Sequence, residues 1–522
     1  MKKLLYVFLT ATPLMFTSCS NDDDADLGPG EFDGDSKTFQ LQSKSDATIS
    51  GTATFVENAD GTATVNLDLE GVTTGSHPAH IHANSAAEGG DIVIDLTPVD
   101  ASGESVTIVT ATNAGAAITY TALLEFDGYI NVHQSTDDLG TLIAQGDVGI
   151  NELTGDTKEY ALNSVTVPTI SGTATLSKRV SGASLLEVQL EGTPADGIHP
   201  GHIHVNSAAE GGGIAISLTP VDGASGYSAT HIEATDEDAA ITYADLLEYD
   251  GYINIHLSAD DLTTLVAQGD IGINELTEES KEYVLNSVTA PTISGMATIY
   301  KRVSGAALLE IALEGTPDGG AHPAHIHANT AAEGGDILIS LATVDGTTGK
   351  SLTHIDANDA DEPVSYEDLL DFDGYINVHL SDTELSVLVA QGDIGQNELT
   401  GTAQEYDLAA VSDAAIFGTA TFAERVNGET LVTLAIEGTV DGGVHPAHVH
   451  MGAVADAPGG ITVSLNSVTG LTGTSMTNVT KLDDDTPIDY AGMIAIDGYV
   501  NVHASVDDLA TLIAQGNVGA NN

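Results

Sequence analysis

The chain has 522 residues, and 77 acidic residues against 13 basic ones give it a formal net charge of −64 at pH 7. This charge excludes nucleic acid as a partner and disfavours anionic lipid surfaces, because both would repel the protein. The single cysteine excludes an internal disulfide.

The first residues predict export. Lys2 and Lys3 precede an apolar run from Leu4 to Phe16, which is too short to span a membrane but has the length of a signal-peptide core. The run leads into Phe16-Thr17-Ser18-Cys19, which resembles the lipobox of bacterial lipoproteins. That resemblance implies a signal peptide over residues 1–18 and a lipid on Cys19 that holds the protein at a membrane.

An acidic segment follows, with Ser20-Asn21-Asp22-Asp23-Asp24 at its start and a Gly/Pro/Asp stretch up to about Ser36. Its composition predicts a flexible tether over residues 19–36. Acidic residues behind a lipidated cysteine also resemble the surface-export signal of lipoproteins in some Gram-negative bacteria. We therefore expect an exported protein, lipid-anchored to the outer membrane and exposed at the surface, with a plain solvated linker as the alternative.

The rest of the chain is a fourfold repeat marked by histidine. The motif His-Pro-x-His-[Ile/Val]-His occurs four times, and its first histidines are separated by 122, 123 and 123 residues. About fifty residues after each motif comes Tyr-[Ile/Val]-Asn-[Ile/Val]-His. A period of this length matches independently folding domains rather than a solenoid repeat. The expected domains are 37–157, 158–280, 281–403 and 404–522.

Within each repeat the apolar residues alternate with polar ones. Val65, Leu67 and Leu69 alternate with Asn66, Asp68 and Glu70, and the other repeats show the same pattern. This period of two predicts strands, and the Gly, Asp and Pro turns between apolar segments have the spacing of a sandwich or barrel. We expect an all-β fold with about seven or eight strands per repeat.

Two kinds of short helix are expected between the strands. Ser135–Asp138 and Ser381–Glu384 have the form of capping boxes before Leu-x-x-Leu-[Ile/Val], which predicts a helix after the last histidine of each repeat. The segments 242–247 and 365–370 are weaker candidates.

The strand pattern also predicts where the histidines point. In an extended His80-Ile81-His82 segment the two imidazoles share one face and Ile81 lies on the other, so Ile81 should enter the core and the histidines should lie outside the barrel wall. Pro78 allows His77 to turn toward them. If the second motif forms a neighbouring strand, its His133 completes a set of four ligands.

Neutral imidazole is a common ligand of copper and zinc. The alternative is that exposed strand faces tolerate histidine. Against this, the last repeat differs around the motif yet keeps all four histidines, whereas His231 and His354 align with Ile108 and Asn478 and behave as surface residues. The predicted ligand sets are His77, His80, His82 and His133; His199, His202, His204 and His256; His322, His325, His327 and His379; and His445, His448, His450 and His503.

These two motifs, with a Gly-[Asp/Asn]-[Ile/Val]-Gly ending, resemble the CHRD domain, a family named for chordin. The resemblance implies four tandem immunoglobulin-like, Greek-key β-sandwich or barrel domains with a distant similarity to copper/zinc superoxide dismutase. The chain lacks the cysteines of the dismutase disulfide. Lys178-Arg179 and Lys301-Arg302 align by spacing with Val56-Glu57, so they are not expected to form a shared catalytic element.

We therefore expect a metal-binding protein without an assigned catalytic residue, rather than a dismutase-like enzyme. The other hypothesis is an extracellular interaction module that binds a protein or surface ligand through loops such as Thr97–Val109 and gains avidity by repetition.

Overall fold

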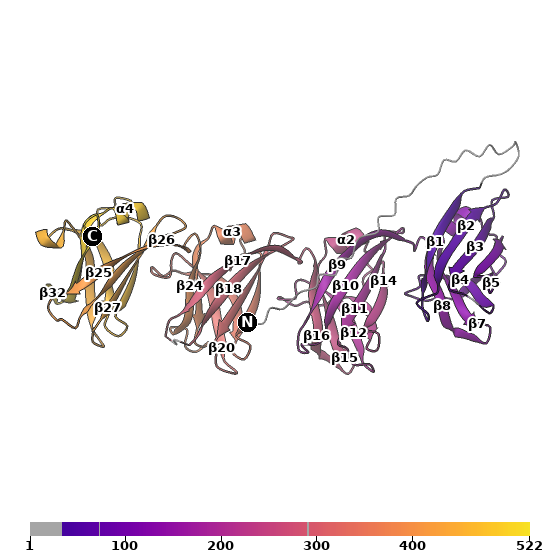
Figure 1. The fold of residues 1–522 in the computed structure, drawn as a ribbon, viewed down its shortest axis with the longest axis horizontal. Helices are drawn as coiled ribbons and strands as arrows, with labels where there is room; N and C mark the ends of the chain where they lie inside the picture. Colours follow the sequence, from indigo (N-terminus) through magenta and orange to yellow (C-terminus); the bar gives the residue numbers. More distant parts are fainter. Residues whose placement is uncertain (1–33, 73, 290–291) are drawn as a thin grey trace. The chain divides into compact units, whose positions relative to one another are not determined.

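The structure is a computed structural model that describes residues 34–72, 74–289 and 292–522. It is all-β, and four eight-stranded units follow one another along the chain (Figure 1). This confirms the expected fold class, the fourfold repeat and the number of strands. The predicted signal peptide, Cys19 and the tether up to residue 33 lie outside the described residues.

Repeat 1 forms one eight-stranded sheet in the order β5-β4-β7-β8-β1-β2-β3-β6. Its elements are β1 (Ser36–Ser43), β2 (Ser50–Glu57), β3 (Ala63–Glu70), β4 (His77–Ala83), β5 (Ile92–Val99), β6 (Glu104–Val109), α1 (Tyr120–Leu124), β7 (Asp127–Ser135) and β8 (Asp138–Gly149). Side-chain bonds connect its two outer strands, since Thr107 Oγ1 accepts from the Thr97 N–H at 2.7 Å and Ser105 Oγ donates to the Thr97 carbonyl at 2.6 Å. The segment 97–109, expected as a loop, is therefore mostly these two strands and the turn that joins them.

Repeats 2 and 3 are closed barrels with the same strand order. Repeat 2 contains β9 (Leu153–Ser164), β10 (Ser171–Arg179), β11 (Ser184–Glu191), β12 (Ile198–Val205), β13 (Ile214–Asp222), β14 (Tyr227–Ile232), α2 (Tyr243–Leu247), β15 (Asp250–Ser258) and β16 (Asp261–Gly272). Repeat 3 contains β17 (Leu276–Ser287), β18 (Ser294–Arg302), β19 (Ala307–Glu314), β20 (Ala321–Ala328), β21 (Ile337–Asp345), β22 (Lys350–Ile355), α3 (Tyr366–Leu370), β23 (Asp373–His379) and β24 (Leu388–Gly395).

Repeat 4, like repeat 1, forms an eight-stranded sheet with the same strand order. It contains β25 (Leu399–Ala410), β26 (Phe417–Arg425), β27 (Thr430–Glu437), β28 (Val444–Met451), the short 3-10 helix η1 (Val454–Asp456), β29 (Ile461–Thr469), β30 (Thr474–Val479), α4 (Tyr490–Ile494), β31 (Asp497–Ser505) and β32 (Asp508–Gly519).

Each repeat has its own hydrophobic core. The alternating residues Val65, Leu67 and Leu69 are at most 2% exposed, and the intervening side chains point outward. Ile81, Ile130 and Val132 are fully buried in the same cluster, as predicted from the alternation of the two histidine motifs.

The expectation of a helix after the last histidine is wrong. That segment continues as strand β8 in repeat 1, where Leu142 lies opposite His133 and Ala144 opposite Val132. The Asp138 side chain accepts from the Thr141 N–H at 3.1 Å and so caps a turn rather than a helix. In repeat 3 the corresponding residues form turns before β24.

The weaker helix candidates are confirmed as α2 and α3. Thr242 with Asp245, and Ser365 with Asp368, form reciprocal capping boxes at their starts. Each helix has only five residues, but its buried tyrosine and leucine anchor it to the core. Repeats 1 and 4 carry α1 and α4 at the same place.

The chain divides into two compact units, and the second comprises Gly155–Lys178 and Gly182–Asn522. β9, β17 and β25 each cross a predicted domain boundary, because they begin at Leu153, Leu276 and Leu399. Over the described ranges, none of the helices combines the length and the apolar character needed to cross a bilayer.

Candidate metal centre

Antiparallel pairing brings the two histidine motifs of each repeat together. β4 lies beside β7, with His80 opposite Asn131 and His82 opposite Tyr129. The same pairing joins β12 to β15, β20 to β23 and β28 to β31. The strand that carries the second histidine motif is therefore the neighbour of the first-motif strand in all four repeats, as the prediction for His133 required.

Three histidines of each predicted set converge. Their candidate ligand nitrogens all lie within 4.8 Å of one another. The triads are His80, His82 and His133; His202, His204 and His256; His325, His327 and His379; and His448, His450 and His503.

The first histidine of each motif is not part of the triad. His77 Nδ1 lies 3.2 Å from the carbonyl of His133, and its Nε2 lies 3.0 Å from the carbonyl of Thr74. His199, His322 and His445 make the same 3.2 Å contact with the carbonyl of the last histidine of their repeat. These buried rings therefore connect the start of one strand to the backbone of the next.

The triads lie outside the barrel wall, as predicted, but they are not on an open surface. His82 and His133 are only 8% and 7% exposed, and the His80 side chain is 14% exposed. The rings of His80 and His133 have their centroids 5.1 Å apart, and this value is the same in every repeat. Burial of this degree argues against the alternative that an exposed strand face merely tolerates histidine.

Backbone carbonyls fix which nitrogen each ring presents. His82 Nδ1 lies 2.9 Å from the Gly90 carbonyl, and His133 Nδ1 lies 2.7 Å from the Leu139 carbonyl. A carbonyl only accepts, so each Nδ1 carries a proton and each Nε2 presents a lone pair to the centre of the triad. Equivalent contacts hold His204, His327, His379, His450 and His503.

The first ring of each triad presents its other nitrogen. His80 Nε2 lies 3.7 Å from the Asp95 carboxylate, which leaves Nδ1 on the inner side. His325 Nδ1 lies 3.1 Å from His379 Nε2, and the matching pair in repeat 4 is 3.2 Å apart. Each triad therefore offers one Nδ1 and two Nε2 atoms.

Most of these inner nitrogens are buried without a hydrogen-bond partner. In repeat 2 all three lack one, and in the other repeats at least one does; the atoms are His80 Nδ1, His133 Nε2, His202 Nδ1, His204 Nε2, His256 Nε2, His327 Nε2 and His450 Nε2. Buried polar atoms are rarely left unpaired. Converging lone pairs without a donor are what a bound cation would satisfy, so the residues present fit a metal ion.

Burial also favours the neutral form of the first and last histidines of each triad. It lowers the pKa of His80 below the ordinary 6.5, and the neighbouring His133 lowers it further. Burial lowers the pKa of His133 as well, partly offset by its bond to the Leu139 carbonyl. The matching histidines of the other repeats shift in the same direction. A neutral ring is the form that binds a metal.

A second layer of residues supports the triad. The Tyr129 ring stacks on His82 with centroids 4.9 Å apart, and its hydroxyl accepts from the Gly90 N–H at 3.1 Å. Asn131 Nδ2 lies 3.4 Å from His82 Nε2, and its Oδ1 accepts from Gln145 at 2.9 Å. The sequence analysis singled out neither Tyr129 nor Asn131, although both stand in the same Tyr-Ile-Asn-Val-His motif as His133. The carbonyls of Gly90 and Leu139 carry no sequence signal.

Residues 36–142 match the CHRD domain. The match covers β1 to β7 and both histidine motifs of repeat 1. The three later repeats, with the same strand order and triads, are consistent with tandem copies of this CHRD domain. The chain has no significant match among curated proteins.

Proposed function

We propose that each of the four repeats binds one transition-metal ion, copper or zinc, through its histidine triad. The supporting observation is the convergence of three largely buried imidazoles in each repeat, with at least one inner nitrogen per repeat that has no hydrogen-bond partner. Imidazole ligands suit both ions, and three of them leave room for a fourth ligand.

The surroundings of the triads favour retention of a bound ion rather than catalysis. The nearest carboxylate to His80 is Asp95, which is 68% exposed and faces the nitrogen directed away from the centre. A catalytic site would need an open path from solvent to the ion, and rings this buried restrict such a path.

We further propose that the protein is an exported lipoprotein that displays these domains at the cell surface. The proposal rests on the apolar run from Leu4 to Phe16, the lipobox-like segment ending in Cys19 and the acidic residues behind it. Surface display would place the four sites where they can capture ions from the surroundings, and the acidic exterior would attract cations.

Metal content measured by mass spectrometry tests the binding proposal. The untagged chain is stripped with a chelator, incubated with zinc or copper, desalted and measured, and one ion per repeat is expected. A variant with His133, His256, His379 and His503 changed to Ala should retain none while its circular dichroism stays that of a β protein. The matched control changes the two histidines outside the motifs, His231 and His354, and should bind like the parent. A folded parent chain that stays metal-free after exposure to both ions would refute the proposal.

A further inference from the structure

One arginine from repeat 3 and one from repeat 4 are completely buried. Arg302 ends β18 and Arg425 ends β26, and both side chains have no exposed surface. A buried guanidinium is costly unless it is paired and hydrogen-bonded. Both arginines form their ion pair with an aspartate of the preceding repeat.

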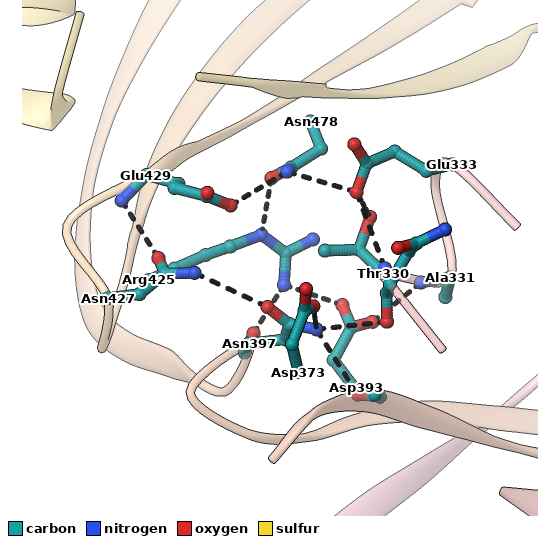
Figure 2. Close-up of polar contacts among 12 residues, drawn as sticks. Thr330, Ala331, Glu333, Asp373, Asp393, Asn397, Arg425, Asn427, Glu429 and Asn478 are labelled. Atoms are coloured by element: carbon teal, nitrogen blue, oxygen red, sulfur yellow. Dashed lines mark hydrogen bonds and ion pairs between the residues drawn. The ribbon is translucent and has the colours of Figure 1, made fainter. Parts of the chain in front are cut away.

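Arg425 lies at the centre of a polar network (Figure 2). Its Nη1 donates to Asp393 Oδ2 at 2.7 Å and also to the carbonyl of Asn397. Its Nε donates to Asn478 Oδ1 at 2.8 Å, and the Asn478 amide donates to Glu333 of repeat 3 at 3.2 Å. The network therefore connects β26 and β30 of repeat 4 to the end of β24 and to the loop after β20 in repeat 3.

Backbone bonds reinforce this contact. The Val426 and Asn427 N–H groups donate to the carbonyls of Glu398 at 2.9 Å and Gln396 at 3.1 Å. The turn after β26 is thus aligned with the turn after β24, and the arginine enters beside it.

The same arrangement is present at the junction between repeats 2 and 3. Arg302 Nη1 donates to Asp270 Oδ2 at 2.7 Å and to the carbonyl of Asn274, and Val303 N–H donates to Glu275 at 2.9 Å. His354 takes the place of Asn478, because His354 pairs with β19 in the same register in which Asn478 pairs with β27. The Nε2 atom of His354 lies 4.0 Å from the Glu210 carboxylate. His231 and His354 were both expected to be surface residues, but the side chain of each is only 7% exposed.

The strand registers correct the alignment made from spacing. Arg302 and Arg425 donate their backbone N–H to Ala306 and Glu429, and in repeat 1 Asn58 donates to Thr62 in the same way. The equivalent of the arginines is therefore Asn58, one position beyond Glu57. Repeat 1 has no arginine for this role.

Repeat 4 lacks the other half of the pair. Asp270 and Asp393 each use Oδ1 to accept a loop N–H, from Ala208 and Ala331, both at 2.7 Å. In repeat 4 this task falls to Asn517, whose Oδ1 accepts from Val454 at 2.8 Å. An amide keeps the acceptor but supplies no charge for an arginine.

We propose that this face of a repeat is a docking surface for the next copy of the same domain. The buried arginine fixes the orientation of the docked domain, so that repeats 2 to 4 move as one body. Asn58 stands at the arginine position of repeat 1 and Asn517 at the aspartate position of repeat 4. These two residues restrict the arginine–aspartate pair to junctions between the four repeats, much as capping repeats end other arrays. This inference does not depend on metal binding.

Distance distributions between spin labels in repeats 3 and 4 test it. Labels are attached at Val284→Cys and Leu471→Cys, which are 57% and 75% exposed, in the full chain with Cys19→Ser. The parent should give a single narrow distribution. Asp393→Asn reproduces the residue at position 517, and Arg425→Asn reproduces the residue at position 58; each should replace the narrow distribution by a broad one.

The control is Lys481→Asn, which removes one positive charge from an exposed pair in repeat 4. It should leave the distribution narrow. Because Arg425→Asn can also loosen repeat 4 itself, Asp393→Asn decides the outcome: an unchanged narrow distribution in that variant, with both repeats folded, would overturn the inference. A double variant that is no broader than either single one would show that the two residues act as one contact.

Discussion

Metal should stabilise the protein against heat, and the size of the effect follows from linkage. An ion that binds only the folded state, at a free concentration 100-fold above its dissociation constant, adds about 2.7 kcal/mol to the stability of its domain. For a barrel such as Leu276–Gly395, a stability change of 1 kcal/mol moves Tm by about 4 °C, so saturation should raise Tm by about 10 °C.

Two matched variants separate the ligands from the other buried histidines. The first changes His133 and its three counterparts to Ala, and the second changes His77 and its three counterparts to Ala. Each removes one buried ring per repeat together with the polar contacts of that ring, so each should lower the metal-free stability by about 1–3 kcal/mol per repeat. Only the first variant removes a ligand nitrogen.

Differential scanning calorimetry with and without zinc, at the same protein concentration, gives the comparison. The rise in Tm should vanish in the first variant and persist in the second. If the first variant kept the rise, the triads would not be the site. If the second variant lost it completely, His77 and its counterparts would act as ligands, contrary to the contacts of their rings with backbone carbonyls.

Three further predictions concern pH, the supporting residues and the helices. Burial lowers the pKa of the first and last histidines of each triad, so the unfolded chain takes up protons near pH 6.5 at these residues while the folded chain does not. The metal-free protein should therefore lose stability as pH falls below about 6.5, measured by urea unfolding at pH 7.5 and 5.5. A flat profile would contradict the lowered pKa of these histidines. Tyr375→Phe keeps the ring stacked on His327 but removes the acceptor for the Gly335 N–H. The zinc affinity of repeat 3, measured by competition titration, should therefore fall by about tenfold. An unchanged affinity would limit the role of Tyr375 to packing. Ser365→Ala removes one half of a capping box and should lower the free energy of unfolding by about 1 kcal/mol. Hydrogen exchange should become faster only in α3. An equal rise of exchange in α2 would refute a local effect.

The strand faces were predictable because side-chain alternation is a local property. Ile81 and Ile130 had to lie opposite the histidines of their own strands in any extended conformation. The capping boxes at Thr242 and Ser365 were equally readable, since their donors and acceptors lie three residues apart. The capping pattern at Ser135 misled for the same reason: pairing with β7 outweighs a local preference for helix in the residues that follow.

The sequence by itself determined the fourfold repeat, the β class and the histidines that share a face. Tertiary structure alone decided that His77 binds backbone carbonyls instead of joining His80 and His82, because that choice depends on where the carbonyl of His133 lies on a neighbouring strand. It also decided that Arg302 and Arg425 are buried between repeats, since their partners lie in the preceding domain. Local periodicity fixes the direction of a side chain, whereas its partner is set by which distant segments the folded backbone brings within hydrogen-bonding distance.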